Sequence, residues 1–237
     1  MRALAARGRH CVLVARREHR LRTLAAEVGG EYEVCDVGDR NAVERMATAI
    51  RERHPAVDLL VNNAGMPGRA GFADIDADRL DALVRVNYLG SVWCLRSLLP
   101  ALEAANGADV VNIVSVAGTV AFPPSGPYSA SKHAQLAFSR AVTAELRPRG
   151  IRVHTVNPGF VETEGFPQRT VLRNPVLRHA VIGPDEVARH VVGALDRDSR
   201  ETFVPGWYRI AMLAQGLAPS LVARVVARAG YRPRIGT

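Results

Sequence analysis

Two side chains four residues apart could carry proton transfer in this chain. Tyr128 and Lys132 fall within a stretch of helical periodicity, so both would project from one face of a helix. A phenol titrates at about pH 10, and an ammonium group held nearby lowers that pKa by favouring the phenolate. A tyrosine tuned in this way can take a proton from an alcohol or give one to a carbonyl oxygen. A solvent-exposed helix pair is the competing interpretation of this spacing alone.

Lys132 is also the only lysine among 31 basic residues, the rest of which are arginine. A position that keeps lysine in such a chain indicates a need for a compact ammonium whose pKa can move, which a guanidinium cannot supply.

Two polar residues complete the candidate set. Ser115 follows an apolar run expected to be a strand, and its hydroxyl could hydrogen-bond the same substrate oxygen as Tyr128. Asn87 lies within an expected long helix and could hold a water molecule that links Lys132 to solvent. Neither residue is diagnostic alone, but all four in this order in one chain form a specific combination.

The elements that must position these residues follow from the hydrophobic pattern. We expect strands at 12–14, 32–35, 57–61, 110–114, 153–156 and 202–204, and helices at 18–28, 41–53, 78–105, 127–147 and 185–195. Apolar strands separated by helices predict a doubly wound parallel sheet covered on both faces, here a single α/β domain over residues 1–237. In such sheets the ligand lies beyond the carboxyl ends of the strands, where the polar and glycine-bearing segments of this chain occur.

The combination of motifs resembles the short-chain dehydrogenase/reductase family over nearly the whole chain. The matching segments are Asn62-Asn63-Ala64-Gly65, Asn87-Tyr88-Leu89-Gly90, Ser115, Tyr128-Ser129-Ala130-Ser131-Lys132 and Asn157-Pro158-Gly159-Phe160-Val161-Glu162-Thr163. The resemblance implies a Rossmann-like fold and an NAD(P)-dependent oxidoreductase that interconverts a secondary alcohol and a ketone by hydride transfer. It implies a catalytic tetrad of Asn87, Ser115, Tyr128 and Lys132, with Tyr128 as the acid/base and Lys132 also holding the nicotinamide ribose.

The residues after the first apolar run favour NADP(H) over NAD(H). A carboxylate at this turn would accept hydrogen bonds from a ribose 2′-hydroxyl, whereas a cation accommodates a 2′-phosphate. The chain has Arg16 and Arg17 there, and a guanidinium suits a phosphate. Surface charge in an arginine-rich protein is the alternative interpretation of both.

The resemblance implies further cofactor contacts. Asp36 and Val37 would lie beside the adenine, and Asn63, Ala64 and Gly65 beside the adenine ribose. The segment expected to orient the nicotinamide carboxamide contains Pro158, Gly159, Val161 and Thr163.

The family's first strand and its glycine-rich phosphate loop have no counterpart in this sequence. Met1 to Gly8 matches the end of the helix that follows that loop, so about 20 residues are missing from the pattern. The missing strand would lie between the strands at 12–14 and 57–61, whose backbone groups would stay unpaired without it. A start assigned downstream of the true one is the favoured explanation, with a true fragment as the alternative. We therefore expect the 237-residue chain to bind NADP(H) poorly.

Two C-terminal segments bear on partners. Residues 164–182 are the expected substrate loop, where Phe166, Val171, Leu172 and Leu177 suggest a small hydrophobic alcohol or ketone. Residues 207–230 form an amphipathic basic tail that Gly216 and Pro219 would break into two helices. The tail could contact a membrane surface peripherally or narrow the pocket, but packing on the body or on a partner in a homo-oligomer is the favoured alternative.

Composition narrows the remaining classes. The net charge of +8 could suit a nucleic acid, but the arginines are dispersed and form no binding module. The three cysteines have no paired or metal-ligand spacing, and no leader or membrane span is apparent, so we expect a cytoplasmic protein without a metal. A catalytically silent binding or regulatory protein, or an inactive fragment, is the competing function.

Overall fold

The computed structural model describes residues 1–68, 70–168, 172 and 177–228. Its strands are β1 (Val12–Ala15), β2 (Glu31–Val34), β3 (Leu59–Asn62), β4 (Ala108–Ile113), β5 (Ile151–Pro158), β6 (Phe160–Val161), β7 (Val181–Ile182) and β8 (Glu201–Val204). Its α-helices are α1 (Arg2–Ala5), α2 (Glu18–Val28), α3 (Arg40–Arg53), α4 (Ala77–Val84), α5 (Gly90–Ala104), α6 (Gly126–Leu146), α8 (Pro184–Asp196), α9 (Tyr208–Leu217) and α10 (Pro219–Arg228). Shorter helical turns are η1 (Arg85–Leu89), η2 (Val116–Gly118), η3 (Arg147–Arg149) and η4 (Leu177–Ala180).

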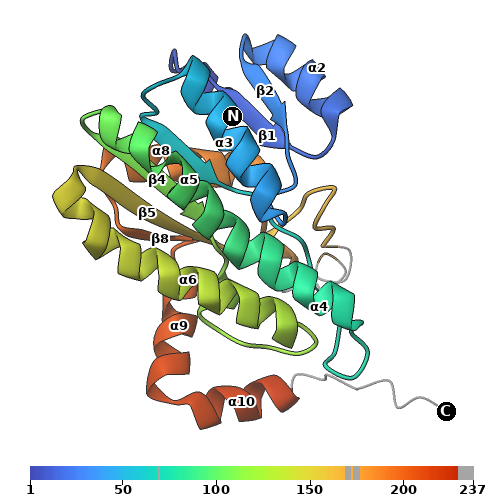
Figure 1. Cartoon of the computed structure of the whole chain (residues 1–237). Coiled ribbons are helices and arrows are strands. Elements are labelled where there is room, and N and C mark those ends of the chain that lie inside the picture. The colour runs from blue at the N-terminus through green and yellow to red at the C-terminus, as the bar shows by residue number, and fades with distance from the viewer. Residues whose placement is uncertain (69, 169–171, 173–176, 229–237) are drawn as a thin grey trace.

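The paired strands of the described residues all run parallel, as the apolar runs predict. One sheet has the order β3-β4-β5-β8, and β1 pairs with β2 in a second sheet. Helices α3, α5 and α6 lie on the near side of the strands and α8 lies behind them (Figure 1). The doubly wound, Rossmann-like architecture is therefore confirmed.

The ends of the helices follow local chemistry. Asp39 caps α3 by accepting hydrogen bonds from the backbone N–H groups of Asn41 and Ala42. Pro184 occupies the first turn of α8, where no backbone donor is needed. Gly29 ends α2 with a φ of 65°, a left-handed conformation that glycine adopts without strain.

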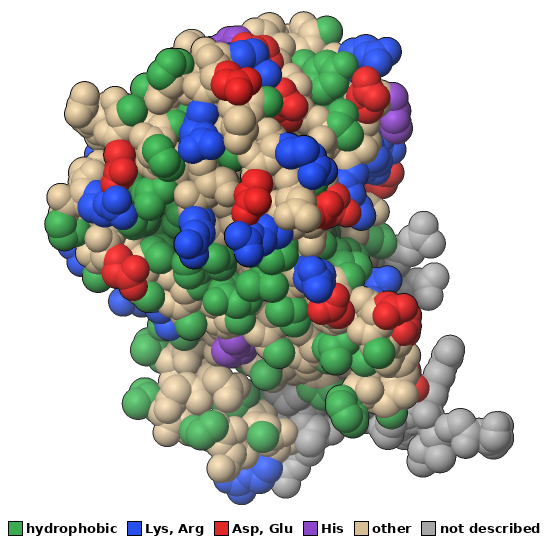
Figure 2. Space-filling model, viewed as in Figure 1, with side chains coloured by type: hydrophobic (Ala, Val, Ile, Leu, Met, Phe, Trp, Pro, Cys, Tyr) green, Lys and Arg blue, Asp and Glu red, His purple; other side chains and the backbone are tan. Residues whose placement is uncertain are grey.

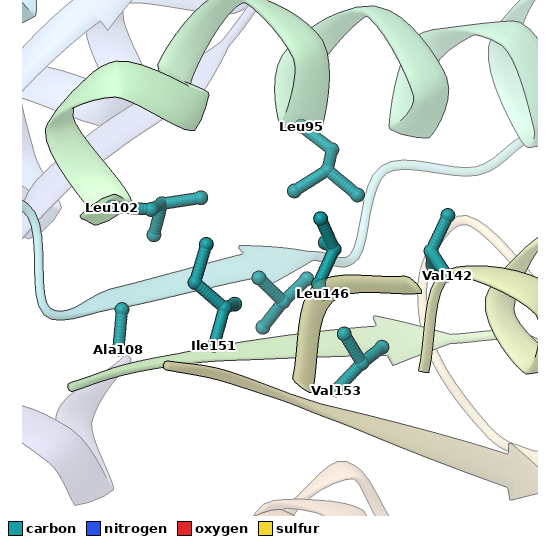
Figure 3. Close-up of a cluster of buried hydrophobic side chains, with 8 residues drawn as sticks. Leu95, Leu102, Ala108, Val142, Leu146, Ile151 and Val153 are labelled. Carbon is teal, nitrogen blue, oxygen red and sulfur yellow. The ribbon is translucent and has the colours of Figure 1, made fainter. Parts of the chain in front are cut away.

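The core lies where β4 and β5 meet α5 and α6. Its fully packed members are Leu95, Leu102, Ala108, Val110, Val142, Leu146, Ile151 and Val153 (Figure 3). Strand β4 is buried on both faces, at the apolar Val110 and Val111 and at the polar Asp109 and Asn112, as expected for a central parallel strand.

β1 and β3 belong to different sheets, and no backbone hydrogen bond joins them within the described residues. Leu13 of β1 packs in one hydrophobic cluster with Leu59 and Val61 of β3, so side chains hold the two sheets together. Those two β3 residues are only half-buried, unlike their counterparts in β4. The family resemblance places its additional strand at this position.

The expected helix at 78–105 is interrupted. The chain runs through α4, the π-helical turn η1 and α5, with Asn87 inside the π-helical turn. Such turns often occur at functional sites because they redirect a side chain out of the regular helical register. Hydrophobic periodicity cannot reveal one extra residue in a turn, so the sequence predicted a single helix.

The tail divides into α9 and α10 at Ala218, as Gly216 and Pro219 predict. Tyr208 packs on the body beside Val116 and Phe203, while Ile210 and Leu217 are 70% and 85% exposed. No helix within the described ranges combines the length and apolar composition needed to cross a membrane.

Candidate active site

Strand β4 and helix α6 bring the predicted proton-transfer residues together. Ser115 lies two residues after β4, and a side-chain hydrogen bond links it to Tyr128 in the first turn of α6. One turn later, the Lys132 ammonium donates a hydrogen bond of 3.2 Å to the carbonyl oxygen of Ile113, the last residue of β4. The loop after β3 lies over this group, since a Cβ at Gly65 would stand 3.8 Å from the Lys132 nitrogen. The site thus lies at the carboxyl ends of the strands, as expected.

Ser115 is fixed by the backbone around it. Its oxygen accepts a hydrogen bond of 3.1 Å from the Ala117 N–H, and its hydroxyl lies 3.4 Å from the carbonyl oxygen of Pro158. These contacts join η2 to the end of β5. They hold the serine oxygen beside the tyrosine hydroxyl, where a substrate oxygen could accept hydrogen bonds from both.

Tyr128 differs from expectation in its pKa. Burial raises the pKa of Tyr128 above its ordinary value, and the hydrogen bond with Ser115 offsets only part of that rise. The sequence led us to expect a lowered pKa because of Lys132. In this structure two hydrogen-bond acceptors engage the ammonium group, and burial is the larger influence on the phenol.

Lys132 is only 3% exposed. Its nitrogen donates hydrogen bonds to Ile113 O and, at 2.8 Å, to Gln135 Oε1. Burial lowers the pKa of Lys132 to about 7, so the charged and neutral forms are close in free energy at neutral pH. Gln135 was not among the sequence candidates, because it reads as an ordinary polar residue on a helix.

Asn87 fixes the backbone of the loop after β3 through hydrogen bonds. Its amide oxygen accepts a hydrogen bond of 2.8 Å from the Met66 N–H, and its nitrogen donates to Met66 O at 3.2 Å and to Ser131 Oγ at 3.0 Å. The side chain is fully buried. These contacts place Asn87 among the site residues, but they fix the loop backbone and do not touch Lys132.

The expected adenine end of the cofactor site lies at the ends of β1 and β2. Arg16 is exposed, and its guanidinium lies 3.5 Å from the Asp36 carboxylate. Asp36 also accepts a hydrogen bond of 2.9 Å from the Gly38 N–H, which shapes the turn after β2. Val37 packs against the start of α5, where a Cβ at Gly90 would approach it to 3.0 Å.

Arg17 is turned toward a different part of the chain. It lies 3.5 Å from the Glu164 carboxylate, to which Arg20 donates two hydrogen bonds of 2.5 and 2.9 Å. These ion pairs join the start of α2 to the segment after β6. Both arginines after β1 thus lie 3.5 Å from a carboxylate, and the Arg16 side chain is the more exposed of the two, at 73% against 61%.

The remaining predicted cofactor residues follow β3 and β5. Asn63, Ala64 and Gly65 are exposed on the loop that Asn87 fixes. Pro158 ends β5, and Gly159 lies against the Tyr208 ring so closely that a Cβ would overlap it at 2.2 Å. Thr163 accepts a hydrogen bond from the Phe166 N–H, while Val161 pairs with Ile182 in the small β6–β7 sheet.

The expected substrate loop meets the site at one described residue. The Phe166 ring packs edge-on against Tyr128, with ring centroids 6.3 Å apart. Leu172 is 44% exposed. Val171 and the side chain of Leu177 lie outside the described residues.

Three groups that could hold a metal converge at the opposite edge of the sheet. The Nε2 atoms of His10 and His54 lie 2.9 and 3.0 Å from the same Glu31 oxygen. Arg53 pairs with the other oxygen of that carboxylate at 3.0 Å. The carboxylate already has cationic and hydrogen-bonding partners, so the cluster is explained without a metal.

Comparisons with known proteins identify the family of this chain. Residues 1–170 match the family model described as short chain dehydrogenase. The mouse dehydrogenase/reductase SDR family member 4 is 33% identical over 168 residues, which cover 68% of this chain and 60% of that protein. The match thus spans less than two thirds of that relative's length.

Two solved structures share the fold. A short-chain dehydrogenase from Streptomyces avermitilis superposes with a TM-score of 0.79 at 25% identity, covering 97% of this chain and 92% of its own. An alcohol dehydrogenase from the archaeon Thermococcus sibiricus, complexed with 5-hydroxy-NADP, gives 0.74 at 28% identity, covering 85% of this chain and 88% of its own.

Proposed function

Because the chain belongs to the short-chain dehydrogenase/reductase family, we propose that it interconverts a secondary alcohol and a ketone by hydride transfer with NADP(H). The observation that carries this proposal is the hydrogen bond between Tyr128 and Ser115. The buried ammonium of Lys132, one helical turn after Tyr128, is bonded to the last residue of the strand that precedes Ser115. A proton donor, a second oxygen ligand and a cation thus occupy one end of the parallel sheet.

The chain's own residues would handle the proton while the nicotinamide supplies or accepts the hydride. Tyr128 would donate its proton to the carbonyl oxygen during reduction, and Ser115 would hydrogen-bond the same oxygen. Because burial keeps the phenol protonated at neutral pH, the free site is better prepared for reduction than for oxidation.

The residues present fit both ends of a dinucleotide. Lys132 has two described acceptors for its three N–H groups, which leaves one donor for a ribose hydroxyl. A Cβ at Gly65 would come within 3.3 Å of Asn87 Oδ1 and 3.8 Å of the Lys132 nitrogen, so glycine lets the loop backbone lie close to both. At the other end, Arg16 offers a guanidinium to a 2′-phosphate.

We propose NADP(H) over NAD(H) on that basis, with Arg16 as the main phosphate contact and Arg17 as the lesser one. The proteins solved with 5-hydroxy-NADP and with NADP among the similar structures support this preference. Asp36 beside Arg16 is the feature that opposes it, because its carboxylate could instead accept from a 2′-hydroxyl.

The proposed substrate is a small hydrophobic ketone or alcohol. Phe166 packs against Tyr128, so an apolar group beside the reacting carbon would contact an aromatic ring. We also propose that the protein acts in the cytoplasm and as one domain, with residues 164–182 as its substrate loop.

The test is NADPH oxidation followed by absorbance with a panel of hydrophobic ketones. We expect measurable turnover that falls about a thousandfold in Tyr128→Phe, because general acid catalysis contributes gains of that order. Phe138→Leu, outside the site, is the matched aromatic control. Turnover that is equal in wild type and Tyr128→Phe would reject the mechanism.

Cofactor affinity needs a separate measurement. The unpaired edges of β1 and β3 lie where the family resemblance places a strand and its phosphate loop, so we propose that these 237 residues bind NADPH more weakly than micromolar. Isothermal titration checks this, and a micromolar dissociation constant would refute it. The assay above therefore uses millimolar NADPH.

A catalytically silent binding protein is the second candidate. The Glu164 ion pairs with Arg17 and Arg20 favour it, since they tie the expected substrate loop to the start of α2. NADPH binding without turnover of any ketone in the panel would support it.

The tail offers a peripheral contact. Ile210, Leu213 and Leu217 recur along the exposed face of α9, and residues 202–237 contain arginines but no acidic residue. We propose that this face can lie on an anionic lipid surface. Flotation with phosphatidylserine vesicles, lost in neutral vesicles and in Leu213→Glu, is the expected result. If the protein does not float with anionic vesicles, the exposed face of α9 would instead be expected to bind a protein partner.

A further inference from the structure

A buried amide in α6 contacts the same ammonium group as the active site. Gln135 lies three residues after Lys132 and is 1% exposed. Its Oε1 accepts a hydrogen bond of 2.8 Å from the Lys132 nitrogen, the shorter of the two described bonds of that group. Its Nε2 donates to Ser91 Oγ in α5 at 3.2 Å.

Ser91 fixes which way the amide points. The Ser91 hydroxyl donates to the carbonyl oxygen of Tyr88 at 2.9 Å, so its oxygen is left to accept from Gln135. A flipped Gln135 amide would place its NH₂ group against the ammonium and its oxygen against the committed serine. The chain of bonds therefore has one favourable direction, from Lys132 through Gln135 and Ser91 to the backbone.

We propose that Gln135 is a positioning residue for Lys132, holding the ammonium at the base of the site while Ser91 fixes the orientation of its amide. The proposal rests on the proposed function of Lys132 but concerns a residue outside the family motifs. Gln135 touches neither of the expected substrate ligands, so it acts through the lysine.

The surroundings explain why such a residue is needed. Tyr128 of α6 is a titratable neighbour, while Asn87 of η1, Ser91 of α5 and Ser115 after β4 are uncharged. No salt bridge reaches Lys132 among the described residues. A buried ammonium without a carboxylate partner is stabilised in its charged form only by hydrogen bonds to neutral oxygen atoms. Of the two oxygen atoms that accept from Lys132, that of Gln135 is the nearer.

The lone lysine makes this measurable without any assay of activity. Protein labelled with ¹³C-lysine gives one side-chain Cε resonance, whose chemical shift reports the protonation of Lys132 as the pH is varied. Gln135→Met keeps the length of the side chain and removes the acceptor. We expect it to lower the pKa of Lys132 by about one unit, because a hydrogen bond to a charged group is lost.

Two further variants separate positioning from packing. Ser91→Ala keeps Gln135 but frees its amide, and we expect a smaller shift in the same direction. Ser139→Ala, a buried change one turn further along α6, should leave the Lys132 pKa where it is in the wild type. If Gln135→Met fails to fold, the Ser91→Ala titration decides the question.

A Lys132 pKa unchanged in Gln135→Met, or in Ser91→Ala where the first variant does not fold, would overturn the proposal. A pH–rate profile for ketone reduction should move with the NMR titration if Lys132 acts in catalysis. A shift in the NMR titration without any turnover would uphold the role of Gln135 and reject the proposed function instead.

Discussion

Tyr128 and Lys132 are both shifted toward their neutral forms, and the cause is burial. Burial raises the pKa of the phenol and lowers that of the ammonium to about 7. Taking charge out of water costs free energy unless partners replace the water. A bound ligand that brings oxygen atoms to the ammonium would favour its charged form, and the charged form would in turn lower the pKa of Tyr128.

The Lys132 shift predicts a pH dependence of stability. Between about pH 7 and pH 9 the unfolded chain retains a proton on this lysine that the folded chain has released. The free energy of unfolding should therefore rise with pH relative to Lys132→Met, by roughly 1 kcal/mol per pH unit. Urea denaturation of both proteins at pH 7, 8 and 9 measures the difference.

The range stops at pH 9 because the lysine of the unfolded chain begins to release its own proton above that pH, while the titration of Cys94, which both proteins contain, cancels from the comparison. Burial raises the pKa of Cys94 to about 12, so its thiol ionises first in the unfolded chain. A difference between wild type and Lys132→Met that stays constant from pH 7 to 9 would contradict the shift.

Arg16 carries the prediction on cofactor choice. Arg16→Ala should reduce the ratio of kcat/KM for NADPH to that for NADH by about tenfold, the effect of losing one exposed guanidinium–phosphate contact. Steady-state kinetics with both cofactors gives the ratio. Arg22→Ala is the matched control, since Arg22 pairs with Glu18 on the exposed side of α2. If Arg16→Ala leaves this ratio unchanged, Arg16 does not determine the preference for NADPH.

The sequence predicted the site residues that belong to a recognisable motif. Ser115, Tyr128 and Lys132 do lie together. Gln135 and Ser91 could not be found, because polar residues within helical periodicity give no sign of which ones the fold buries. The prediction of a lowered pKa for Tyr128 was wrong for a related reason, because the spacing of two residues does not reveal how deeply the fold buries them.

At the scale of elements, a buried charged pair ties β4 to β5. Asp109 accepts a hydrogen bond of 2.8 Å from His154 and another of 2.8 Å from Arg152. Burial opposes the charged forms of both Asp109 and His154. The hydrogen bonds outweigh it, so the pKa of Asp109 is lowered and that of His154 is raised. His154 also contacts the carbonyl oxygen of Ser199, just before β8.

Asp109→Ala should lower the free energy of unfolding by about 3 kcal/mol, because it leaves His154 buried without its partner. The lowered carboxyl pKa contributes stability above about pH 4 that is lost as the pH falls through it. The raised imidazole pKa contributes stability below about pH 6.5 that is lost as the pH rises through it. Urea denaturation at pH 5.5 should show the full loss. Asp78→Ala, on the exposed surface of α4, is the control, and equal losses in both would contradict the role of the pair.

Hydrophobic runs located β1, β4, β5 and β8 within a few residues. Strands β4 and β5 are buried nearly throughout, whereas β1 and β8 are only partly buried. The π-helical turn at Asn87 and the short β6–β7 pair were not anticipated. Both depend on tertiary contacts of the loops beyond the sheet rather than on local periodicity.

At the scale of the whole molecule, the two larger sheets of the described residues differ in how their strands are paired. β4 is paired on both sides, whereas β1 and β2 are paired only with each other. Hydrogen exchange followed by mass spectrometry should show β4 and β5 protected at least tenfold longer than β1 and β2, because the smaller sheet can open without the larger one. Equal protection would mean that the side-chain cluster around Leu13 makes the two sheets one cooperative unit.

One face of the molecule also suits a second copy of the chain. Figure 2 shows hydrophobic side chains gathered across the middle of the viewed face, over α5 and α6. Trp93 and Phe138 are half-buried in this region, and Ala137 is exposed. We expect a homo-oligomer through this face, and Ala137→Glu should shift sedimentation toward the monomer. Ala214→Glu on α9 is the control, and a wild-type monomer would reject this interface.

A last consequence follows from the single, buried lysine. A protease that cleaves only after lysine has one cutting point, and in the native chain the surrounding helices shield it. The rate of digestion into residues 1–132 and 133–237 would then measure how often α6 opens in the unmodified protein.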